Sequence, residues 1–292
     1  MGKGKVVKQS WGDRIYVTFI YMILIAFTVC AMYPFLHVIA VSVSGANYVA
    51  RGEITIIPKG INLEAYQSVL KNKNILTGYG NTIYVTVLTT ILGVIVTAMT
   101  AYPLSKKRLP GNKFFVIFIC ITMWFQAGMI PNFLVMKQLN LLDNLNGLVL
   151  SQLTTGYNVI VMRSFFAGIP DSLEESAKLD GANDMQVLFK IVLPLSKPII
   201  STVALWIAVA SWNSFFQPML YLTDTAKYTL QIFLRDIVVN ASISADAMEM
   251  GTITSDMIRY ATIMVATVPI LLVYPYIQKY FVQGTMVGAV KE

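Results

Sequence analysis

The sequence predicts an all-α integral membrane protein with six transmembrane helices, and three observations support this fold class. Of the 292 residues, 56% are hydrophobic and only 13% are charged, which is about half the charged share of a soluble domain. The mean hydropathy is +0.64. The charges are also segregated, leaving six stretches without Asp, Glu, Lys or Arg, each of which reaches the roughly 17–25 residues that a helix needs to cross a bilayer. These stretches are residues 15–50, 74–105, 114–136, 144–162, 198–223 and 260–278.

The predicted order of segments follows from these stretches. Residues 1–14 form a basic N-terminus, 15–44 the first span, 45–75 an external segment, and 76–279 the main transmembrane domain. The first charge-free stretch is far longer than the apolar part of a secretion signal, so we expect a retained span. The main domain and its tail are expected to comprise spans at about 78–105, 114–136, 144–166, 198–222 and 257–279, a loop between spans four and five at 170–197, an external loop at 223–256, and a C-terminal tail at 280–292.

The distribution of Lys and Arg predicts the orientation. If the N-terminus is cytoplasmic, 14 of the 22 Lys and Arg residues lie on the cytoplasmic side and 8 on the external side, as the positive-inside rule requires. Residues 106–113 alone hold four cations in one short turn. We therefore expect both termini in the cytoplasm. The net charge of +7 is explained by this bias, which makes the lipid bilayer the expected partner and not nucleic acid.

The residue types that carry chemistry are scarce. The only histidine, His37, cannot form a multi-histidine metal site, and we interpret it as a packed or hydrogen-bonded imidazole. Cys30 and Cys120 fall inside predicted spans and are interpreted as buried apolar residues. No Gly-rich phosphate-binding loop is present, so no ATP site of that kind is expected in this chain. An intramembrane enzyme or sensor is a poor alternative, because the charge-free stretches contain no carboxylate.

Residues 170–198 predict two short helices with a turn between them. Ser172 with Glu175 has the spacing of a capping box at the start of the first helix. Gly181 is placed to end that helix with a positive φ. Asn183 with Gln186 repeats the capping spacing for a second helix, which is expected to end before Pro194.

At these residues the chain resembles a known family. Glu175-Ser176-Ala177, then three residues, Gly181, then nine residues, and Ile191-Val192-Leu193-Pro194 match the pattern E-A-A, G, I-x-L-P of the permease subunits of binding-protein-dependent ABC importers. Ser176 in place of Ala is the sole departure. The maltose-permease-like carbohydrate class is resembled by Asp180-Gly181-Ala182, Ser211-Trp212-Asn213 and the C-terminal Gly288-Ala289-Val290-Lys291. Its subgroup for oligosaccharides from complex polysaccharides is resembled by residues 57–66 and 126–131.

This resemblance implies a MetI-like fold in a bacterial plasma membrane, with a cytoplasmic helix-turn-helix coupling loop at 170–197 that docks on a separate ATPase. It further implies a second homologous permease, two ATP-binding subunits that hold ATP and Mg, and an external solute-binding protein. This chain itself would hold no cofactor or metal and have no catalytic activity. The residues assigned to the coupling contact are Glu174, Glu175, Ala177, Asp180, Gly181, Ala182, Ile191, Leu193 and Pro194.

The implied cargo is a carbohydrate, in particular an oligosaccharide from a complex polysaccharide. A polyol phosphate or a peptide remains an alternative, because the loop pattern concerns the ATPase and not the cargo. Polar groups inside the membrane usually face the bundle interior, although amides also hold helices together and aromatic residues also mark the membrane interface. The candidates for the substrate path are Trp124, Gln126, Tyr157, Asn158, Trp212, Asn213, Phe216 and Gln217.

Overall fold

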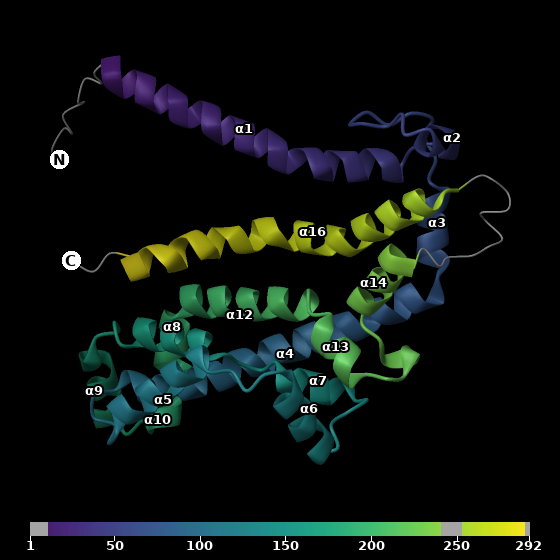
Figure 1. Ribbon diagram of the computed structural model, residues 1–292. Coiled ribbons are helices and arrows are strands. Elements are labelled where there is room, and N and C mark those ends of the chain that lie inside the picture. The colour runs from purple at the N-terminus through teal and green to yellow at the C-terminus, as the bar shows by residue number, and fades with distance from the viewer. Residues whose placement is uncertain (1–10, 241–252, 290–292) are drawn as a thin grey trace. The chain divides into compact units, whose positions relative to one another are not determined.

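The computed structural model describes residues 11–240 and 253–289, and every regular element in these residues is a helix (Figure 1). The predicted loop at 223–256 therefore lies partly outside the described residues. The helices longer than four residues are α1 (Trp11–Ser42), α2 (Ala46–Ala50), α3 (Glu64–Lys71), α4 (Lys73–Ser105), α5 (Asn112–Trp124), α6 (Met129–Gln138), α7 (Leu145–Ser151), α8 (Gly156–Phe166), α9 (Asp171–Leu179), η1 (Leu188–Val192), α12 (Lys197–Trp212), α13 (Phe216–Tyr221), α14 (Leu230–Asn240) and α16 (Ser255–Ala289). The shorter ones are α10 (Asp184–Val187), α11 (Leu193–Leu195) and η2 (Thr225–Lys227).

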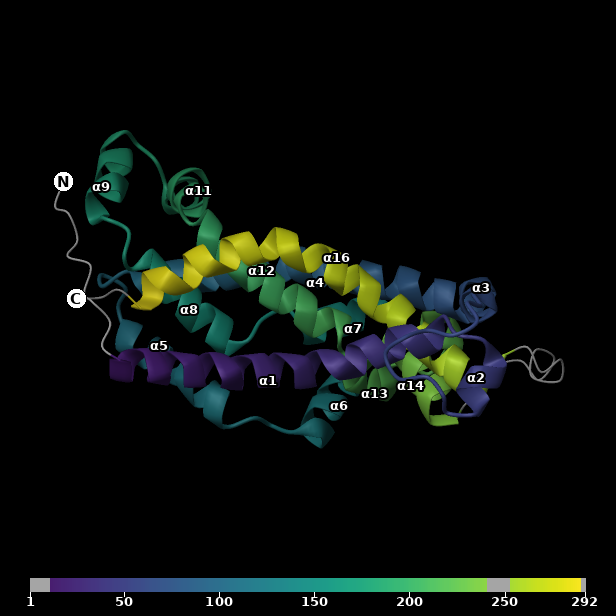
Figure 2. The same cartoon turned by 90° about the horizontal axis from the view of Figure 1, so that it is seen from above.

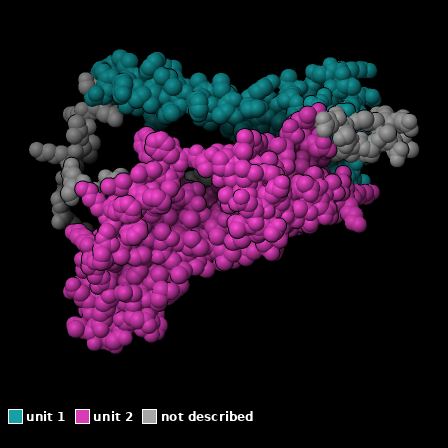
Figure 3. Space-filling view, turned by 60° about the horizontal axis from the view of Figure 1, so that its bottom comes forward, with its two compact units in different colours: residues 1–69, 240–265 teal, residues 70–239, 266–292 magenta. Residues whose placement is uncertain are grey.

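The chain divides into two compact units, which Figure 3 colours separately. Unit 1 comprises residues 1–69 and 240–265, and unit 2 comprises residues 70–239 and 266–292. In unit 1, α1 exposes almost all of its apolar side chains and buries only its last three residues. Such exposure suits a helix that lies in lipid. The imidazole of His37 lies 2.7 Å from the carbonyl oxygen of Thr55, which confirms the hydrogen-bonded histidine predicted from the sequence.

Unit 2 is built around α4, which packs against α8 and α12. Small residues on α4 let the neighbouring backbones come close, as is common between membrane helices. Gly93 is the clearest case, because a Cβ atom there would overlap the carbonyl oxygen of Leu153. The buried apolar core of this region consists of Ala98, Ala101, Tyr102, Leu104, Val159, Met162, Phe166, Val187, Leu188, Val192, Ile199, Val203 and Ile207.

Three described helices are each long and apolar enough to cross a membrane: α1, α4 and residues 255–272 of α16. Two bent pairs raise this number to five if each pair is one span. One pair is α5 with α6, bent by 112°, and the other joins residues 184–195 to α12 with a bend of 87°. Gly128 explains the first bend, since its φ of +85° cannot continue a right-handed helix.

Two further stretches that the sequence predicts as continuous spans are interrupted. Between α7 and α8, residues 152–155 leave the helix, and the Thr155 side chain caps the new helix by accepting from the Asn158 amide. Between α12 and α13, the helix stops at Trp212 and restarts at Phe216. Pro218 then falls in the first turn of α13, where its missing N–H needs no partner. These two interruptions shape the cavity described below.

Candidate functional site

Segment 170–197, which contains α9, α10, η1 and α11, projects from one end of unit 2 (Figures 1 and 2). The predicted capping box of Ser172 with Glu175 is wrong. The helix begins two residues earlier than a Ser172 cap would place it: its N-cap is Pro170, without a side-chain hydrogen bond, and its first residue is Asp171. Pro170 has a φ of −58° and extended ψ, so the fixed proline φ sets the start of the helix instead of the serine hydroxyl.

The turn between α9 and α10 has the predicted geometry. Gly181 has a φ of +87°. Its N–H donates to the Lys178 carbonyl at 3.0 Å, and the Ala182 N–H donates to the Ala177 carbonyl at 2.9 Å, which is the hydrogen-bond pattern of a Schellman motif. The predicted capping box of Asn183 with Gln186 is confirmed, with both of its hydrogen bonds at 2.9 Å. The turn is therefore closed on both sides by backbone and side-chain bonds.

The second helix does not end before Pro194, contrary to the prediction. It continues from α10 through the π-helical turn η1 into α11, which contains Pro194. Proline cannot donate to the carbonyl four residues earlier, and its ring crowds that carbonyl. A π-type widening just before the proline relieves this conflict. The chain turns only at Ser196, before α12 begins.

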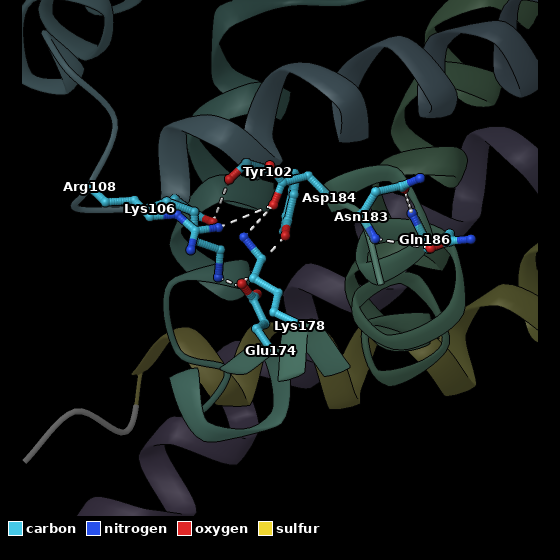
Figure 4. Close-up of polar contacts among 9 residues, drawn as sticks. Tyr102, Lys106, Arg108, Glu174, Lys178, Asn183, Asp184 and Gln186 are labelled. Atoms are coloured by element: carbon cyan, nitrogen blue, oxygen red, sulfur yellow. Dashed lines mark hydrogen bonds and ion pairs between the residues drawn. The ribbon is translucent and has the colours of Figure 1, made fainter. Parts of the chain in front are cut away.

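A group of charged and phenolic side chains fixes segment 170–197 to the end of α4 (Figure 4). Glu174 is 4% exposed, forms an ion pair with Lys106 (8% exposed), and accepts a hydrogen bond from the Tyr102 hydroxyl at 3.4 Å. Asp184 pairs with Lys178 at 2.6 Å and with Arg108 at 3.2 Å. The hydrogen bond from Lys178 lowers the pKa of the Asp184 carboxyl. We call these six residues the clamp: Tyr102, Lys106, Arg108, Glu174, Lys178 and Asp184.

The clamp corrects one assignment made from the sequence. Glu174 was expected at the outer contact with a partner, but its carboxylate faces inward to Lys106. Its neighbour Glu175 is exposed, as are Asp180 and Gly181. The other assigned residues divide between core and surface: Ala177, Ala182 and Leu193 pack against the core of unit 2, Ile191 is half-buried, and Pro194 is exposed.

The surface of segment 170–197 also carries apolar side chains that the sequence pattern did not single out. Leu179, beside the turn, is 89% exposed. Leu173, Met185 and Phe189 are exposed as well. The high exposure of Leu179 on a protruding polar segment is consistent with a contact surface there. The signal in the sequence was the placement of Leu179 between Lys178 and Asp180, off the face that packs on the core.

A cavity of about 640 Å³ lies in unit 2 beside the two helix interruptions. Tyr157, Asn158 and Gln217, three of the predicted path residues, line it. Trp124 and Gln126 do not: Trp124 is 84% exposed at the end of α5, and Gln126 is exposed in the bend between α5 and α6. The cavity is lined by Ser151, Gln152, Thr154, Thr155, Tyr157, Asn158, Trp206, Ile207, Ala210, Ser211, Ser214 and Gln217.

The other three predicted path residues lie near this cavity in sequence but do not line it. The Trp212 ring is 6.3 Å from the Tyr79 ring, measured between centroids. The Asn213 side chain donates to the Val209 carbonyl of its own helix at 2.9 Å. Phe216 is exposed and contacts its neighbour Phe215 edge to face. The break at residues 213–215 changes the direction of Phe216 from that of a continuous helix, whereas Trp212 precedes the break and is still part of α12.

Most of the cavity wall was not predictable from the pattern of polar residues. Gln152 and Ser214 come from the two interruptions and share a hydrogen bond of 3.4 Å. Thr154 is bonded to Thr97 of α4 at 2.7 Å. Trp206 lies against Tyr157, with 5.3 Å between ring centroids. The available signal was the polar run at 151–155 inside a stretch predicted as a membrane span.

A bundle of apolar helices with broken helices beside a polar cavity is the architecture of a membrane permease, because irregular backbone in a membrane is tolerated only where it lines such a cavity. The comparison with protein families agrees. The chain belongs to the family of binding-protein-dependent transport system inner membrane components, which matches residues 113–287. It is thus an integral membrane transport subunit of an ABC importer and not an enzyme.

Individual relatives cover nearly the whole chain. The polygalacturonan/rhamnogalacturonan transport system permease protein YtcP of Bacillus subtilis (strain 168) is 41% identical over 96% of this chain and 99% of its own length. The arabinooligosaccharides transport system permease protein AraQ of Halalkalibacterium halodurans is 26% identical over 89% of this chain and 91% of its own. A chain in the crystal structure of a bacterial ABC transporter involved in the import of the acidic polysaccharide alginate superimposes with a TM-score of 0.91 and 36% identity, covering 94% of this chain and all of that one.

Proposed function

We propose that the chain is one of two permeases of a bacterial carbohydrate importer that takes up oligosaccharides derived from complex polysaccharides. The descriptions of the relatives named above mention polygalacturonan or rhamnogalacturonan, arabinooligosaccharides and alginate. An external solute-binding protein delivers the sugar, and two partner ATPases with bound ATP and Mg drive the cycle. The six charge-free stretches are six spans, with α7 and α8 together forming the fourth, and segment 170–197 is the cytoplasmic coupling loop.

The observation that carries the coupling role is the exposed turn at Leu179–Gly181 on a rigid base. The Schellman motif and the Asn183–Gln186 box fix the turn itself. The clamp fixes α9 to the end of α4, which belongs to the membrane domain. A displacement of Leu179 and Glu175 by a partner would therefore be transmitted to α4, because no flexible loop lies between them. The apolar Leu179 fits a groove on the ATPase, and the exposed acidic side chains can pair with its basic groups.

Co-purification tests this role. Leu179→Asp places a charge at the centre of the contact, so less ATPase should co-purify with the permease pair. Leu139→Asp is the matched control, because Leu139 is also exposed (61%) but follows α6 and lies outside segment 170–197. Equal retention of the ATPase by both variants would overturn the docking assignment.

Cysteine labelling tests the orientation. In a variant without Cys30 and Cys120, a membrane-impermeant reagent applied from outside should label Thr225→Cys but not Ser172→Cys, because the first lies in the proposed external loop and the second in the proposed cytoplasmic one. Both side chains are exposed in the structure, so accessibility alone does not decide the result. Labelling of Ser172→Cys from outside would reverse the topology.

A further inference from the structure

The wall of the 640 Å³ cavity combines two kinds of group. The rings of Tyr157 and Trp206 lie 5.3 Å apart at 40° and form an aromatic wall. The amides of Gln152 and Gln217 and the hydroxyl of Ser214 supply hydrogen-bond donors and acceptors. Among the described residues that line the cavity, none is Asp, Glu, Lys, Arg or His. Aromatic faces match the C–H faces of sugar rings, and neutral amides and hydroxyls match sugar hydroxyls.

Ser211 gives an independent indication of a ligand. It belongs to the cavity wall, is only 6% exposed, and its Oγ has no hydrogen-bond partner in the described part of the chain. A buried hydroxyl without a partner is costly. Because the Ser211 Oγ has less than 1 Å² of accessible surface, a ligand in the cavity reaches it only after rotation of the side chain about χ1. The neighbouring hydroxyls differ: Thr154 is bonded to Thr97, and Ser214 accepts from Gln152.

The position of the cavity supports the same conclusion. Gln152 and Thr155 lie in the interruption between α7 and α8, and Ser214 lies in the one between α12 and α13. Substrate sites of transporters are typically formed where membrane helices are discontinuous, since freed backbone groups can be satisfied by cargo or water there. Residues from both interruptions therefore line the same cavity.

We infer that this cavity binds the uncharged faces of sugar rings through Tyr157, Trp206 and Ser211, and that it does not select cargo by charge. The inference rests on the proposed function and deepens it. One similar structure is described as taking part in the import of the acidic polysaccharide alginate, and an importer for such cargo would have to distinguish it from neutral sugars at some step. A cavity wall without a cation cannot supply this discrimination by Coulomb attraction. Selection for acidity is then left to the external binding protein, which is absent from the test below.

Saturation-transfer difference NMR on the assembled permease–ATPase complex, without binding protein, tests the inference. The two probes are trigalacturonate and its methyl ester, which share ring stereochemistry and differ in charge. We expect both to receive saturation at their ring protons, with affinities that agree within about twofold. Trp206→Ala should reduce the transfer to both probes by the same factor, whereas Trp206→Phe, which keeps an aromatic face, should retain most of it. Trp124→Ala, outside the cavity, should change nothing.

Substitutions at Ser211 add a charge-specific readout. Ser211→Ala should weaken both probes by the same factor, roughly two- to tenfold, the value of one hydrogen bond. Ser211→Asp should weaken trigalacturonate at least about tenfold more than its ester, because a like charge is introduced within contact distance. Preferential binding of trigalacturonate by the parent complex, or transfer that is unchanged by Trp206→Ala, would overturn the inference.

The proposed function has a separate test, whose failure can be distinguished from failure of the cavity assignment. It predicts that an oligosaccharide, presented with the binding protein, stimulates ATP hydrolysis by the full complex. If no sugar of an acidic and neutral panel does so, carbohydrate import itself is wrong. If stimulation occurs but the Trp206 and Ser211 variants bind both probes as the parent does, only the assignment of this cavity is wrong.

Discussion

The clamp and the cavity are both polar regions within the apolar unit 2, yet their polar groups are satisfied differently. In the clamp, the buried Glu174 carboxylate is paired with Lys106 and bonded by Tyr102, all within this chain. In the cavity, the Ser211 hydroxyl has no hydrogen-bond partner among the residues that the structure describes, and the Tyr157 ring is half exposed. A satisfied buried ion pair fixes one geometry, because separating the charges is costly. A neutral cavity wall with an unpaired hydroxyl can instead form hydrogen bonds with a ligand. The comparison separates a region built for rigidity from one built for contact.

The largest expected effect follows from breaking the clamp. Glu174→Ala leaves the Lys106 ammonium buried without a partner, which should cost about 3–5 kcal/mol of stability. Thermal unfolding of the purified complex measures this. Glu175→Ala is the matched control, since its exposed side chain should contribute no more than about 0.5 kcal/mol. The double variant Lys106→Met with Glu174→Leu should recover much of the loss, because no charge is then left unpaired. If Glu174→Ala unfolds at the temperature of Glu175→Ala, the clamp does not hold α9 in place.

The next effect concerns the wall of the cavity. Gly93→Ala forces a Cβ atom against the Leu153 carbonyl, so the 152–155 interruption must move, at a cost of about 1–3 kcal/mol. Sugar-stimulated ATP hydrolysis should fall with it. Gly80→Ala, on the same helix but with nothing within 4 Å, should instead be neutral or stabilising by up to about 1 kcal/mol. Identical behaviour of the two variants would show that the close approach of α4 to the interruption is unimportant.

A smaller effect on stability is expected at the turn of segment 170–197. Gly181→Asp adds a side chain at a φ of +87°, which should lower the free energy of unfolding by roughly 1 kcal/mol. No steric cost is added, because no atom lies within 4 Å of the new Cβ. Its effect on ATPase docking should be larger than its effect on folding. Gly181→Asn tolerates a positive φ well and adds no charge, so it should retain more ATPase in a pull-down. Equal loss from both variants would point to bulk at this position and not to charge or backbone strain.

The smallest effect is expected at Asp143, which lies outside both regions in the loop before α7. The Lys227 ammonium and the backbone N–H groups of Asp224 and Thr223 hold the pKa of this carboxyl below its usual range. Because the pKa of Asp143 is lower in the folded state than its ordinary value of 3.8, the ionised carboxyl stabilises the folded protein at pH values above 3.8. This stabilisation is lost as the pH falls below 3.8 toward the folded-state pKa. The difference in melting temperature between the parent and Asp143→Asn should thus be largest near neutral pH and shrink below about pH 4. A difference that does not vary with pH would assign the loop's stability to other contacts.

Local features were predictable from the sequence because neighbouring residues determine them. The Asn183–Gln186 box and the positive φ of Gly181 depend on residues three or four apart. The inward orientation of Glu174 was not predictable, because its partner Lys106 is 68 positions away and meets it only through the packing of α9 on α4. Sequence spacing makes Glu174 and Glu175 equivalent acidic residues, whereas the fold buries one and exposes the other.

The cavity was predicted only in part for a related reason. Of the path residues predicted from the charge-free stretches, Tyr157, Asn158 and Gln217 line the cavity, and their contact with substrate stays a prediction. Continuous helices over residues 144–166 and 198–222 would place Asn213 on the same helix face as Gln217, four residues later. The interruptions at 152–155 and 213–215 change those directions. The first interruption ends where Thr155 caps α8, and the second ends just before α13, whose first turn contains Pro218. A hydropathy pattern does not report either feature.

The central claim is that ATPase coupling and sugar contact belong to separate regions of this chain. The most direct test is the sugar dependence of ATP hydrolysis by the reconstituted complex, compared between Leu179→Asp and Trp206→Ala. We expect Leu179→Asp to lower the maximal stimulated rate without changing the half-saturating sugar concentration or the order of preference among sugars. Trp206→Ala should raise the half-saturating concentration and leave the ATPase bound. A change of sugar preference in Leu179→Asp, or loss of the ATPase in Trp206→Ala, would contradict the account.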